Sequence, residues 1–300
     1  MKQKMEDIKI TVFTPTYNRA YIISVLYQSL KRQSFKNFEW LVVDDGSQDE
    51  TEELLKQWIN ENNDFPIRYF RQKNGGKCCA INKGLELARG ELFFTVDSDD
   101  YLTDDALEKI NIWEKELSKK QRYCGFAGNL GISECETPNH LFKEKYYEGS
   151  ALDRYGKVDG ERAMVFYTEV HRKYMYPIFS EERFMTEAVT WNRMAHDGYK
   201  MRFYNDIIWI YEYREDGLTK SGSRLFIDNP KGYGLWLRER AIFLKYNWIE
   251  KIKMYYTFIC DLSGKYTLKQ CSEFIGASEN LMNLLWSGRT IVSNLKKMCK

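Results

Sequence analysis

The stretch Phe38-Glu39-Trp40-Leu41-Val42-Val43-Asp44-Asp45-Gly46-Ser47 decides the fold. Its four consecutive apolar residues, Trp40 to Val43, are typical of a β-strand that is buried on both faces, because a half-exposed strand alternates apolar with polar residues. Strands of this kind occur in parallel sheets that helices cover on each side. The acidic and glycine residues that follow predict a turn directly after the strand.

The same unit of strand, turn and helix is repeated through the first 117 residues. Strands are predicted at residues 8–14, 38–43, 67–70 and 92–96, and helices at 20–32, 50–62, 78–88 and 104–117. The strand centres lie roughly 26–30 residues apart, which is the length of a βαβ unit. The predicted fold class is therefore α/β, with a Rossmann-like, mostly parallel sheet between layers of helices.

The pattern changes after residue 120. Further strands are predicted at 123–129, 163–168 and 200–214, and a helix at 187–198. Residues 130–160 carry turn residues without a clear period, so we expect an irregular excursion over the surface. From Lys231 onward the apolar residues have helical spacing. We expect one domain over residues 1–225 and a helical, basic and aromatic region over residues 226–300.

Composition excludes several classes of protein. The 300 residues are 43% hydrophobic, which excludes a disordered chain, and their net charge of +2 is too balanced for a dedicated nucleic-acid binder. The charge is unevenly distributed, because residues 231–300 hold 12 Lys and Arg against 5 Asp and Glu. This basic region predicts contact with an anionic surface, and the alternative is a solvated helical face.

The spacing of the cysteines and the lengths of the apolar runs indicate in which cellular compartment the protein is expected. The seven cysteines show no CxxC or CxxH spacing, and the start of the chain does not resemble a signal peptide. No apolar run reaches the ~18 residues that a membrane span needs. We expect a cytoplasmic protein, with a peripheral position at the inner face of the cell membrane as the alternative.

Polar clusters follow all four of the first predicted strands. Ligands of open parallel sheets bind beyond the carboxyl ends of the strands, so these clusters predict one active cleft. The first turn lacks the G-x-G-x-x-G fingerprint, and no P-loop or G-x-S-x-G motif occurs. The four clusters are Pro15-Thr16-Tyr17-Asn18-Arg19, Asp44-Asp45-Gly46-Ser47, Asn74-Gly75-Gly76-Lys77 and Asp97-Ser98-Asp99-Asp100.

The last cluster predicts a cation site. Three carboxylates within four residues repel one another unless a cation compensates their charge. Oxygen ligands of this kind suit Mg²⁺ or Mn²⁺ that is shared with phosphates. Along an extended chain Asp97 and Asp99 point to the same side, so both can contribute to one ligand complex. The alternative for Asp100 is a favourable charge near the start of the next helix.

The ordered set of these four clusters resembles family 2 glycosyltransferases. The resemblance is close over roughly the first 110 residues and weaker to about residue 225. It implies a glycosyltransferase-A fold, a nucleotide-sugar donor, inversion at the sugar, and a divalent cofactor, Mn²⁺ or Mg²⁺. Among enzymes with the same kind of sheet, nucleotidyltransferases usually have a Gly-rich, basic first turn, which residues 15–19 are not.

The resemblance also implies roles for individual residues. The nucleoside pocket would be lined by Pro15, Tyr17, Asp44 and Asp45, with Asp44 as the expected uracil contact. Lys77 would approach the base or the phosphates, Asp97 the ribose or donor sugar, and Asp99 would hold the metal. The remaining residues assigned to the nucleotide sugar are Asn18, Arg19, Gly76 and Ser98.

The reaction also needs a base that removes the proton of the acceptor hydroxyl. The family places an acidic pair at the start of a later helix, and Glu187 matches the first acid, whereas Ala188 stands at the position of the second. Glu181 and Glu182 are alternative bases, and a helix-capping charge is the alternative role for Glu187. Trp191 could form a sugar platform or pack in the core. Arg214, Lys220 or Arg224 could approach the diphosphate.

These observations predict an inverting, metal-dependent transferase that moves a sugar, with UDP as the expected nucleotide, to a hydroxyl of a glycan or lipid-linked acceptor. The resemblance suggests bacterial surface polysaccharide synthesis. Because Ala188 replaces an acid, a catalytically inactive nucleotide- or glycan-binding module is the main alternative, and a nucleotidyltransferase is a third. For residues 231–300 the expected partners are a membrane surface or a second copy of the chain, and a helical cap on the catalytic domain is a further alternative.

Overall fold

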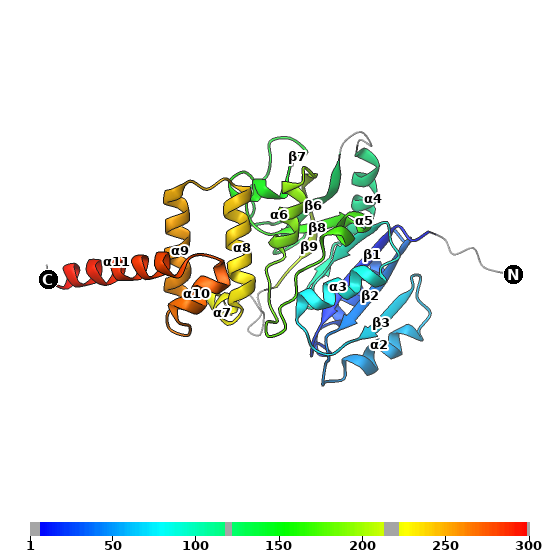
Figure 1. Cartoon of the computed structure of the whole chain (residues 1–300). Helices are drawn as coiled ribbons and strands as arrows, with labels where there is room; N and C mark the ends of the chain where they lie inside the picture. The colour runs from blue at the N-terminus through cyan, green and yellow to red at the C-terminus, as the bar shows by residue number, and fades with distance from the viewer. Residues whose placement is uncertain (1–6, 118–121, 213–221, 299–300) are drawn as a thin grey trace. The chain divides into compact units, whose positions relative to one another are not determined.

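A computed structural model describes residues 7–117, 122–212 and 222–298. The chain forms two compact units, of which the first comprises residues 1–177 and 193–214 and the second comprises residues 178–192 and 215–300 (Figure 1). The predicted division at residue 225 differs from this one, because residues 178–192 group with the C-terminal helices. Within the described residues no helix has the length and apolar character needed to cross a bilayer.

The first unit is built on one nine-stranded sheet with the order β3-β2-β1-β4-β8-β6-β9-β5, and β7 pairs with β9. The four strands β3, β2, β1 and β4 are parallel to one another, whereas β8 joins β4 antiparallel. The strands are β1 (Ile10–Thr16), β2 (Phe38–Asp44), β3 (Ile67–Arg71), β4 (Leu92–Thr95), β5 (Tyr101–Leu102), β6 (Tyr123–Gly131), β7 (Tyr146–Gly149), β8 (Arg162–Tyr167) and β9 (Lys200–Ile210).

Helices alternate with the first four strands, as the sequence predicts. The predicted bounds of these strands differ from the observed ones by at most two residues at either end, and those of the helices by at most four. The parallel α/β architecture is thereby confirmed. The helices are α1 (Ser24–Arg32), α2 (Thr51–Ile59), α3 (Lys77–Leu87), α4 (Ala106–Glu116), α5 (Thr168–His171) and α6 (Ala188–His196), the last of which continues from the second unit into the first.

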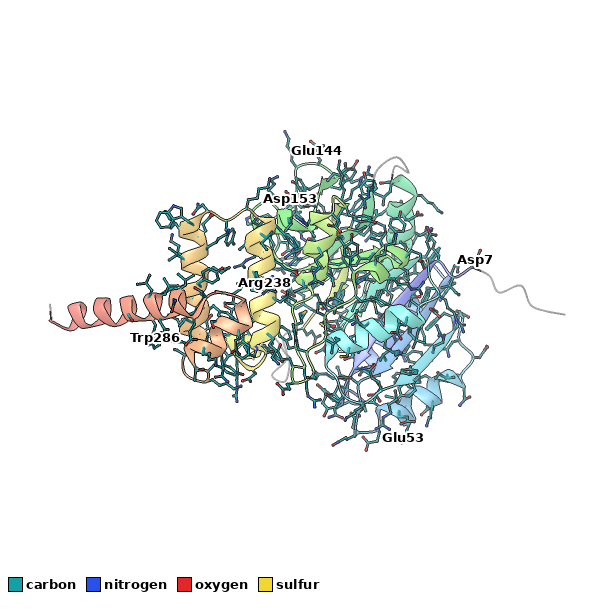
Figure 2. The ribbon with its side chains drawn as sticks, viewed as in Figure 1. Asp7, Glu53, Glu144, Asp153, Arg238 and Trp286 are labelled. Atoms are coloured by element: carbon teal, nitrogen blue, oxygen red, sulfur yellow. The ribbon has the colours of Figure 1, made fainter. Side chains whose placement is uncertain are left out.

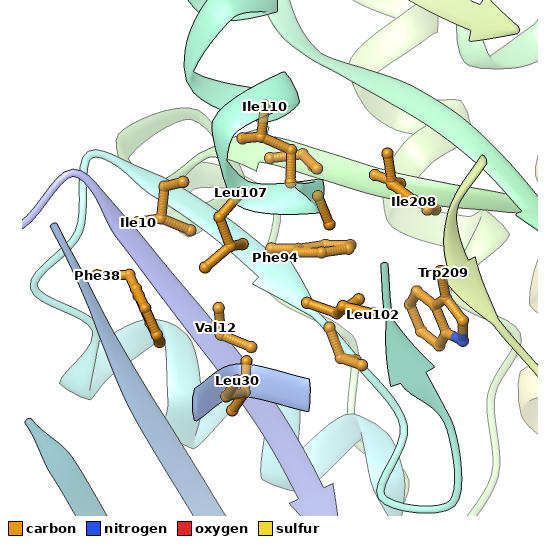
Figure 3. Close-up of a cluster of buried hydrophobic side chains, with 14 of the residues drawn as sticks. Ile10, Val12, Leu30, Phe38, Phe94, Leu102, Leu107, Ile110, Ile208 and Trp209 are labelled. Atoms are coloured by element: carbon orange, nitrogen blue, oxygen red, sulfur yellow. The ribbon is translucent and has the colours of Figure 1, made fainter. Parts of the chain in front are cut away.

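Both faces of the parallel strands are buried. On one face Ile10 and Val12 of β1 share a core with Leu30 of α1 and Leu107 of α4 (Figure 3). On the other face α3 lies across β1 and β2, and Phe13 of β1 packs against it (Figure 1). Every residue of β1 and β2 is buried, which explains why their sequences do not alternate between apolar and polar residues.

The segment between β6 and β8 contains regular secondary structure that was not predicted from the sequence. Residues Tyr146–Gly149 form β7, which pairs with β9, and Ala151–Tyr155 form a 3-10 helix. That helix begins with a capping box, in which the Ser150 backbone N–H donates to the Asp153 carboxylate at 2.7 Å (Figure 2). The prediction of an irregular segment is therefore wrong for residues 146–155, because short edge elements carry too few residues for a period to show.

The second unit is a helical bundle with its own core. The core contains Leu237, Phe258, Ile259 and Ile275, and Trp286 packs against it (Figure 2). The helices are α7 (Ser223–Asp228), α8 (Pro230–Phe243), α9 (Trp248–Leu262), α10 (Leu268–Ile275) and α11 (Glu279–Met298). The expected helical C-terminal region is confirmed as far as residue 298, and α7 spans the predicted domain boundary at residue 225.

Gly84 allows α3 to approach the sheet closely, and this contact yields a prediction. A Cβ atom at Gly84 would lie 2.3 Å from Cε2 of the buried Phe13 ring. Helix propensity alone favours Ala over Gly by ~1 kcal/mol, but overpacking a core costs ~1–3 kcal/mol. We therefore expect Gly84→Ala to lower the free energy of unfolding by about 1–2 kcal/mol in denaturant titrations.

Gly288 of α11 is the matched control. No described atom lies within 4 Å of the position that its Cβ would take. Gly288→Ala should therefore leave the free energy of unfolding unchanged or raise it by up to ~1 kcal/mol. If the two substitutions shifted stability equally, the packing of α3 on Phe13 would not be what requires glycine at position 84.

Candidate functional site

The loops after β1 and β2 are joined by one asparagine. The Asn18 backbone N–H donates to Ser47 Oγ at 2.8 Å, and Asn18 Oδ1 accepts the Gln48 backbone N–H at 2.7 Å. Asn18 has a φ of 53°, a left-handed conformation that asparagine tolerates better than most residues. The predicted site residue Asn18 therefore fixes the shape of two strand-end loops, while its neighbour Tyr17 is 46% exposed.

Asp44 lies inside the protein at the end of β2. Its side chain has no exposed surface. One carboxylate oxygen accepts the Ser47 backbone N–H at 2.8 Å, and the other accepts the Tyr69 hydroxyl at 2.6 Å. The expected direct contact of Asp44 with a uracil base is not supported by this geometry, because the carboxylate is enclosed. The residue instead holds the loop after β2.

Asp45 connects the loop after β2 to the loop after β3. Its Oδ1 accepts the Gly75 backbone N–H at 2.9 Å, and its Oδ2 accepts the Gly76 backbone N–H at 2.7 Å. The turn depends on Gly46, which has a φ of +87° and whose Cβ would lie 3.1 Å from the Asn74 backbone nitrogen. Asp45 is 4% exposed, so it too acts on the loops. Gly76 directly precedes α3, so Lys77 is the first residue of that helix.

Two ion pairs join the acidic cluster after β4 to other strand ends. Lys77 Nζ lies 2.8 Å from Asp97 Oδ1, and the Arg19 guanidinium lies 3.8 Å from Asp99 Oδ2. Residues from the ends of β1, β3 and β4 thus meet at one edge of the sheet, as predicted. Burial, together with the negative charge of Asp97, raises the pKa of Asp99.

Asp100 is the enclosed member of the acidic cluster. The Trp209 indole N–H donates to Asp100 Oδ2 at 2.8 Å, and Asp100 is 9% exposed. Burial and the charges of Asp97 and Asp99 raise the pKa of Asp100 to about 8. Asp100 is not an N-terminal charge of α4, which begins only at Ala106. Trp209, on β9, was missed by the sequence analysis, because nothing local marks an indole that acts 109 residues away.

Burial divides the predicted site residues into two groups. Pro15 and Ser98, like Asp44 and Asp45, are buried and shape the loops. The side chains that reach the surface are Tyr17, Arg19, Lys77, Asp97 and Asp99. An aromatic ring, two cations and two carboxylates therefore lie at the loops that follow β1, β3 and β4.

The carboxylates fit a metal that is shared with a ligand. Asp97 and Asp99 provide the hard oxygen atoms that Mg²⁺ and Mn²⁺ prefer, and the raised pKa of Asp99 reflects its burial and then the negative charge of Asp97. Across residues 7–117, 122–212 and 222–298, no three His, Cys, Asp or Glu side chains converge on one point. The arrangement therefore suits an ion that completes its coordination with phosphate oxygens and water.

The predicted base, Glu187, lies in the second unit. Glu187 directly precedes α6, as expected, and Ala188, at the position of the second acid, is buried. Of the alternative bases, Glu182 accepts the backbone N–H groups of Lys231 at 2.6 Å and Gly232 at 2.8 Å, so it caps α8.

The other residues predicted near the base or the diphosphate differ in their exposure to solvent. Trp191 is half-buried on α6, and Glu181 is largely exposed. Arg224 is exposed and lies 3.5 Å from Asp228, one turn further along α7. Arg214 and Lys220 fall outside the described residues.

Comparison with known proteins identifies the domain. Residues 11–112 match the family model "Glycosyl transferase family 2", and this segment contains all four strand-end clusters. Residues 11–112 therefore form a domain of the glycosyltransferase family 2 type. The match ends within α4, so the family model does not reach Glu187 or the C-terminal helices.

Two curated relatives match the chain beyond the family 2 domain. It is 26% identical over 231 residues to glycosyltransferase GlyA of Streptococcus pneumoniae, a match that covers 71% of this chain and 32% of that protein. It is 28% identical over 229 residues to a Campylobacter jejuni GalNAc(5)-diNAcBac-PP-undecaprenol β-1,3-glucosyltransferase, covering 72% of this chain and 69% of the relative. The chain thus spans about a third of the length of GlyA.

Solved structures of glycosyltransferases share the fold of this chain. Staphylococcus aureus TarS 1–349, in complex with UDP-GlcNAc, has a TM-score of 0.63 at 20% identity and covers 94% of this chain and 87% of its own. The mannosyltransferase PcManGT of Pyrobaculum calidifontis, in complex with GDP-Man and Mn²⁺, has a TM-score of 0.54 at 16% identity, covering 94% and 80%. The expected glycosyltransferase-A fold is confirmed.

The environment of Asp100 predicts how stability depends on pH. Because its folded pKa of about 8 lies above the unfolded value near ~3.9, the native state keeps a proton that the unfolded chain releases. The free energy of unfolding of metal-free protein should therefore fall as the pH rises from about 4 to about 8. Asp100→Asn can still accept the Trp209 N–H and carries no charge, so its stability relative to the unmodified protein should rise by about 3–5 kcal/mol between pH 4 and pH 8.

Denaturant titrations of both proteins in a chelating buffer measure this difference. Asp104→Asn, an exposed acid that pairs with Arg32, is the control and should show no such pH-dependent gain. A stability difference between Asp100→Asn and the unmodified protein that stayed constant from pH 4 to pH 9 would rule out titration of Asp100 as its cause.

Proposed function

We propose that this chain transfers a sugar, with inversion, from a nucleoside diphosphate donor to a hydroxyl group of a glycan or lipid-linked acceptor. The observation that carries the proposal is the set of solvent-accessible side chains at the strand ends, in which two cations pair with two carboxylates and an exposed tyrosine follows β1. A nucleotide sugar presents the complementary groups, which are a flat base, two phosphates and hydroxyl groups.

The donor is bound by residues of the first unit. Tyr17 offers an exposed ring on which a base can stack, and UDP is the proposed nucleotide. Lys77 and Arg19 are the cations available to the diphosphate, and Asp97 is placed to accept hydrogen bonds from ribose or sugar hydroxyls. Asp44 and Asp45 have an indirect role, because they hold the loops that carry these groups.

Asp99 is the proposed ligand of a divalent ion, Mn²⁺ or Mg²⁺. Such an ion would stabilise the negative charge that develops on the departing diphosphate. Burial and the charge of Asp97 raise the pKa of Asp99, which supports this assignment, because a partly buried carboxylate beside another carboxylate gains more from a cation than an isolated one. Trp209 keeps the neighbouring Asp100 in place by its hydrogen bond.

Glu187 is the proposed base. Its carboxylate takes the proton of the acceptor hydroxyl while that oxygen attacks the anomeric carbon opposite the leaving group. The bond from the anomeric carbon to the diphosphate oxygen breaks in the same step, so the configuration of the sugar inverts. The alternative acid Glu182 is unsuited to this role, because both of its oxygens accept hydrogen bonds from the start of α8.

The comparisons support the substrate classes. The TarS structure contains UDP-GlcNAc and the PcManGT structure contains GDP-Man with Mn²⁺, while the Campylobacter jejuni relative is named for an undecaprenol-linked acceptor. We therefore propose a role in bacterial surface polysaccharide synthesis. The second candidate is a module that binds a nucleotide or glycan without turnover, which the replacement of the second acid by Ala188 favours.

Sugar transfer tests the proposal directly. A panel of nucleotide sugars, UDP-GlcNAc and GDP-Man among them, is incubated with acceptor pools with and without Mn²⁺, and the released nucleotide is measured. We expect UDP release that depends on Mn²⁺. Asp99→Ala and Glu187→Gln should each lower kcat by about 100-fold or more, since each removes a group that acts in the transition state.

Control variants separate catalysis from folding. Glu181→Gln replaces a nearby exposed acid and should keep full activity. Full activity of both Asp99→Ala and Glu187→Gln would defeat the assignment of these residues. UDP binding without any donor consumption would favour the binding module, and release of pyrophosphate would favour a nucleotidyltransferase.

Lys77 should affect metal and nucleotide binding in opposite directions. It pairs with Asp97, and its positive charge offsets a small part of the rise in the pKa of Asp99, so it competes with a cation for this acidic cluster. Lys77→Met should weaken UDP binding, through the loss of a phosphate contact, by roughly tenfold. The same change should tighten the binding of Mn²⁺ alone by about two- to fivefold, as expected for a half-exposed ion pair.

Isothermal titration with UDP and with Mn²⁺ separates the two effects. Lys83→Met is the matched control on α3, because Lys83 pairs with Glu86 on the same helix and should change neither affinity. Weaker binding of both ligands to Lys77→Met would mean that the lysine supports the loop rather than competing with the metal.

A further inference from the structure

Helix α9 in the second unit carries exposed apolar residues in its first turns. Its later turns carry Met254, Phe258 and Ile259, which are buried in the core that α9 shares with α8 and α10. The first turns carry Trp248, Ile249 and Ile252, which are 71%, 46% and 36% exposed. Residues that hold a helical bundle together are buried in its core, so these three are not needed for it. They are called here the α9 stripe, an exposed apolar surface that the fold does not explain.

The stripe is continuous and rigidly presented. At 3.6 residues per turn, Trp248, Ile249 and Ile252 fall within an arc of about 100° over the first turns of α9. Asn247 caps the helix, because its side chain accepts the backbone N–H groups of Ile249 at 2.9 Å and Glu250 at 3.0 Å. The cap fixes the exposed Trp248 at the first position of the helix. Ile242, near the end of α8, is 56% exposed as well.

Basic side chains flank the stripe. Lys251 and Lys253 lie to either side of it on α9, and Lys245 lies in the connection from α8; all three are exposed. The acid among them, Glu250, accepts the Asn247 backbone N–H at 2.7 Å and so belongs to the helix cap. An apolar strip with tryptophan at its end and lysines at its edges is the pattern of a helix that lies in a membrane interface.

We propose that the α9 stripe docks the chain onto an anionic lipid surface. Trp248, Ile249 and Ile252 would enter the boundary between headgroups and acyl chains, while Lys251 and Lys253 would remain at the level of the phosphates. A second copy of the chain is the less suitable occupant. A two-fold contact through this stripe would bring the lysines of both copies together, and like charges at such a contact are repulsive.

The proposal does not depend on sugar transfer, so it can fail or hold independently of the proposed function. The experiment is flotation of the full chain with vesicles of phosphatidylglycerol and phosphatidylcholine, and with phosphatidylcholine alone. We expect binding to the anionic vesicles, weakened by high salt. Trp248→Gln and Ile252→Gln should each lower the partition coefficient about tenfold. Lys251→Gln and Lys253→Gln should each lower it about fivefold on the anionic vesicles.

Ile112→Gln is the matched control, because Ile112 is 44% exposed on α4 in the first unit and lies outside the stripe. It should leave vesicle binding unchanged, and circular dichroism of all variants should match the unmodified chain. Failure of the unmodified chain to bind anionic vesicles at any salt concentration would overturn the proposal. Equal losses for Ile112→Gln and Ile252→Gln would overturn it too, as would light scattering that shows a dimer which Trp248→Gln dissociates without any effect on vesicle binding.

Discussion

The concentration of carboxylates at one edge of the sheet is the constraint on which the first unit depends. Parallel strands end at the same edge, so the aspartates that follow β2 and β4 are gathered there by topology. Each must be compensated, since buried or crowded negative charge is unfavourable. The compensation has several sources: backbone N–H groups at Asp45, a tyrosine hydroxyl at Asp44, an indole at Asp100, and the Lys77 and Arg19 side chains at Asp97 and Asp99.

The nature of each partner divides the aspartates by role. Partners fixed in the backbone or the core, such as the Gly76 N–H and the Trp209 indole, stay with their carboxylate, so Asp45 and Asp100 are structural members of the site. Partners on long side chains can move, so Asp97 and Asp99 can exchange theirs for a ligand. The fold therefore combines two carboxylates that can exchange their partners with others whose partners are fixed. Such preorganisation lets binding groups act without reorganising the loops.

The sequence predicted the parts of this arrangement that rest on local pattern. Uninterrupted apolar runs such as Trp40 to Val43 located the strands, and the polar clusters after them located the edge of the sheet. The sequence did not predict the burial of Asp44, because enclosure depends on Tyr69, whose hydroxyl reaches it from the neighbouring strand. Nor did it predict the role of Trp209, because the pairing of β9 with β5, the short strand next to Asp100, joins segments that are far apart in the sequence. A sequence pattern predicts to which side of its own strand or helix a side chain points. The residues that this side chain contacts can belong to elements that are far away in the sequence.

The two ion pairs give the site a further physical property. A lysine that is free in solution must lose rotamer freedom before it can contact a phosphate, and that loss opposes binding. Lys77, held at 2.8 Å from Asp97, is already ordered near the position where the proposed diphosphate would bind. A cation that took over the carboxylate would release the lysine at the moment when the phosphates arrive. Metal and nucleotide would therefore favour each other's binding, because the metal would take the carboxylate and the phosphates would take the lysine that it releases.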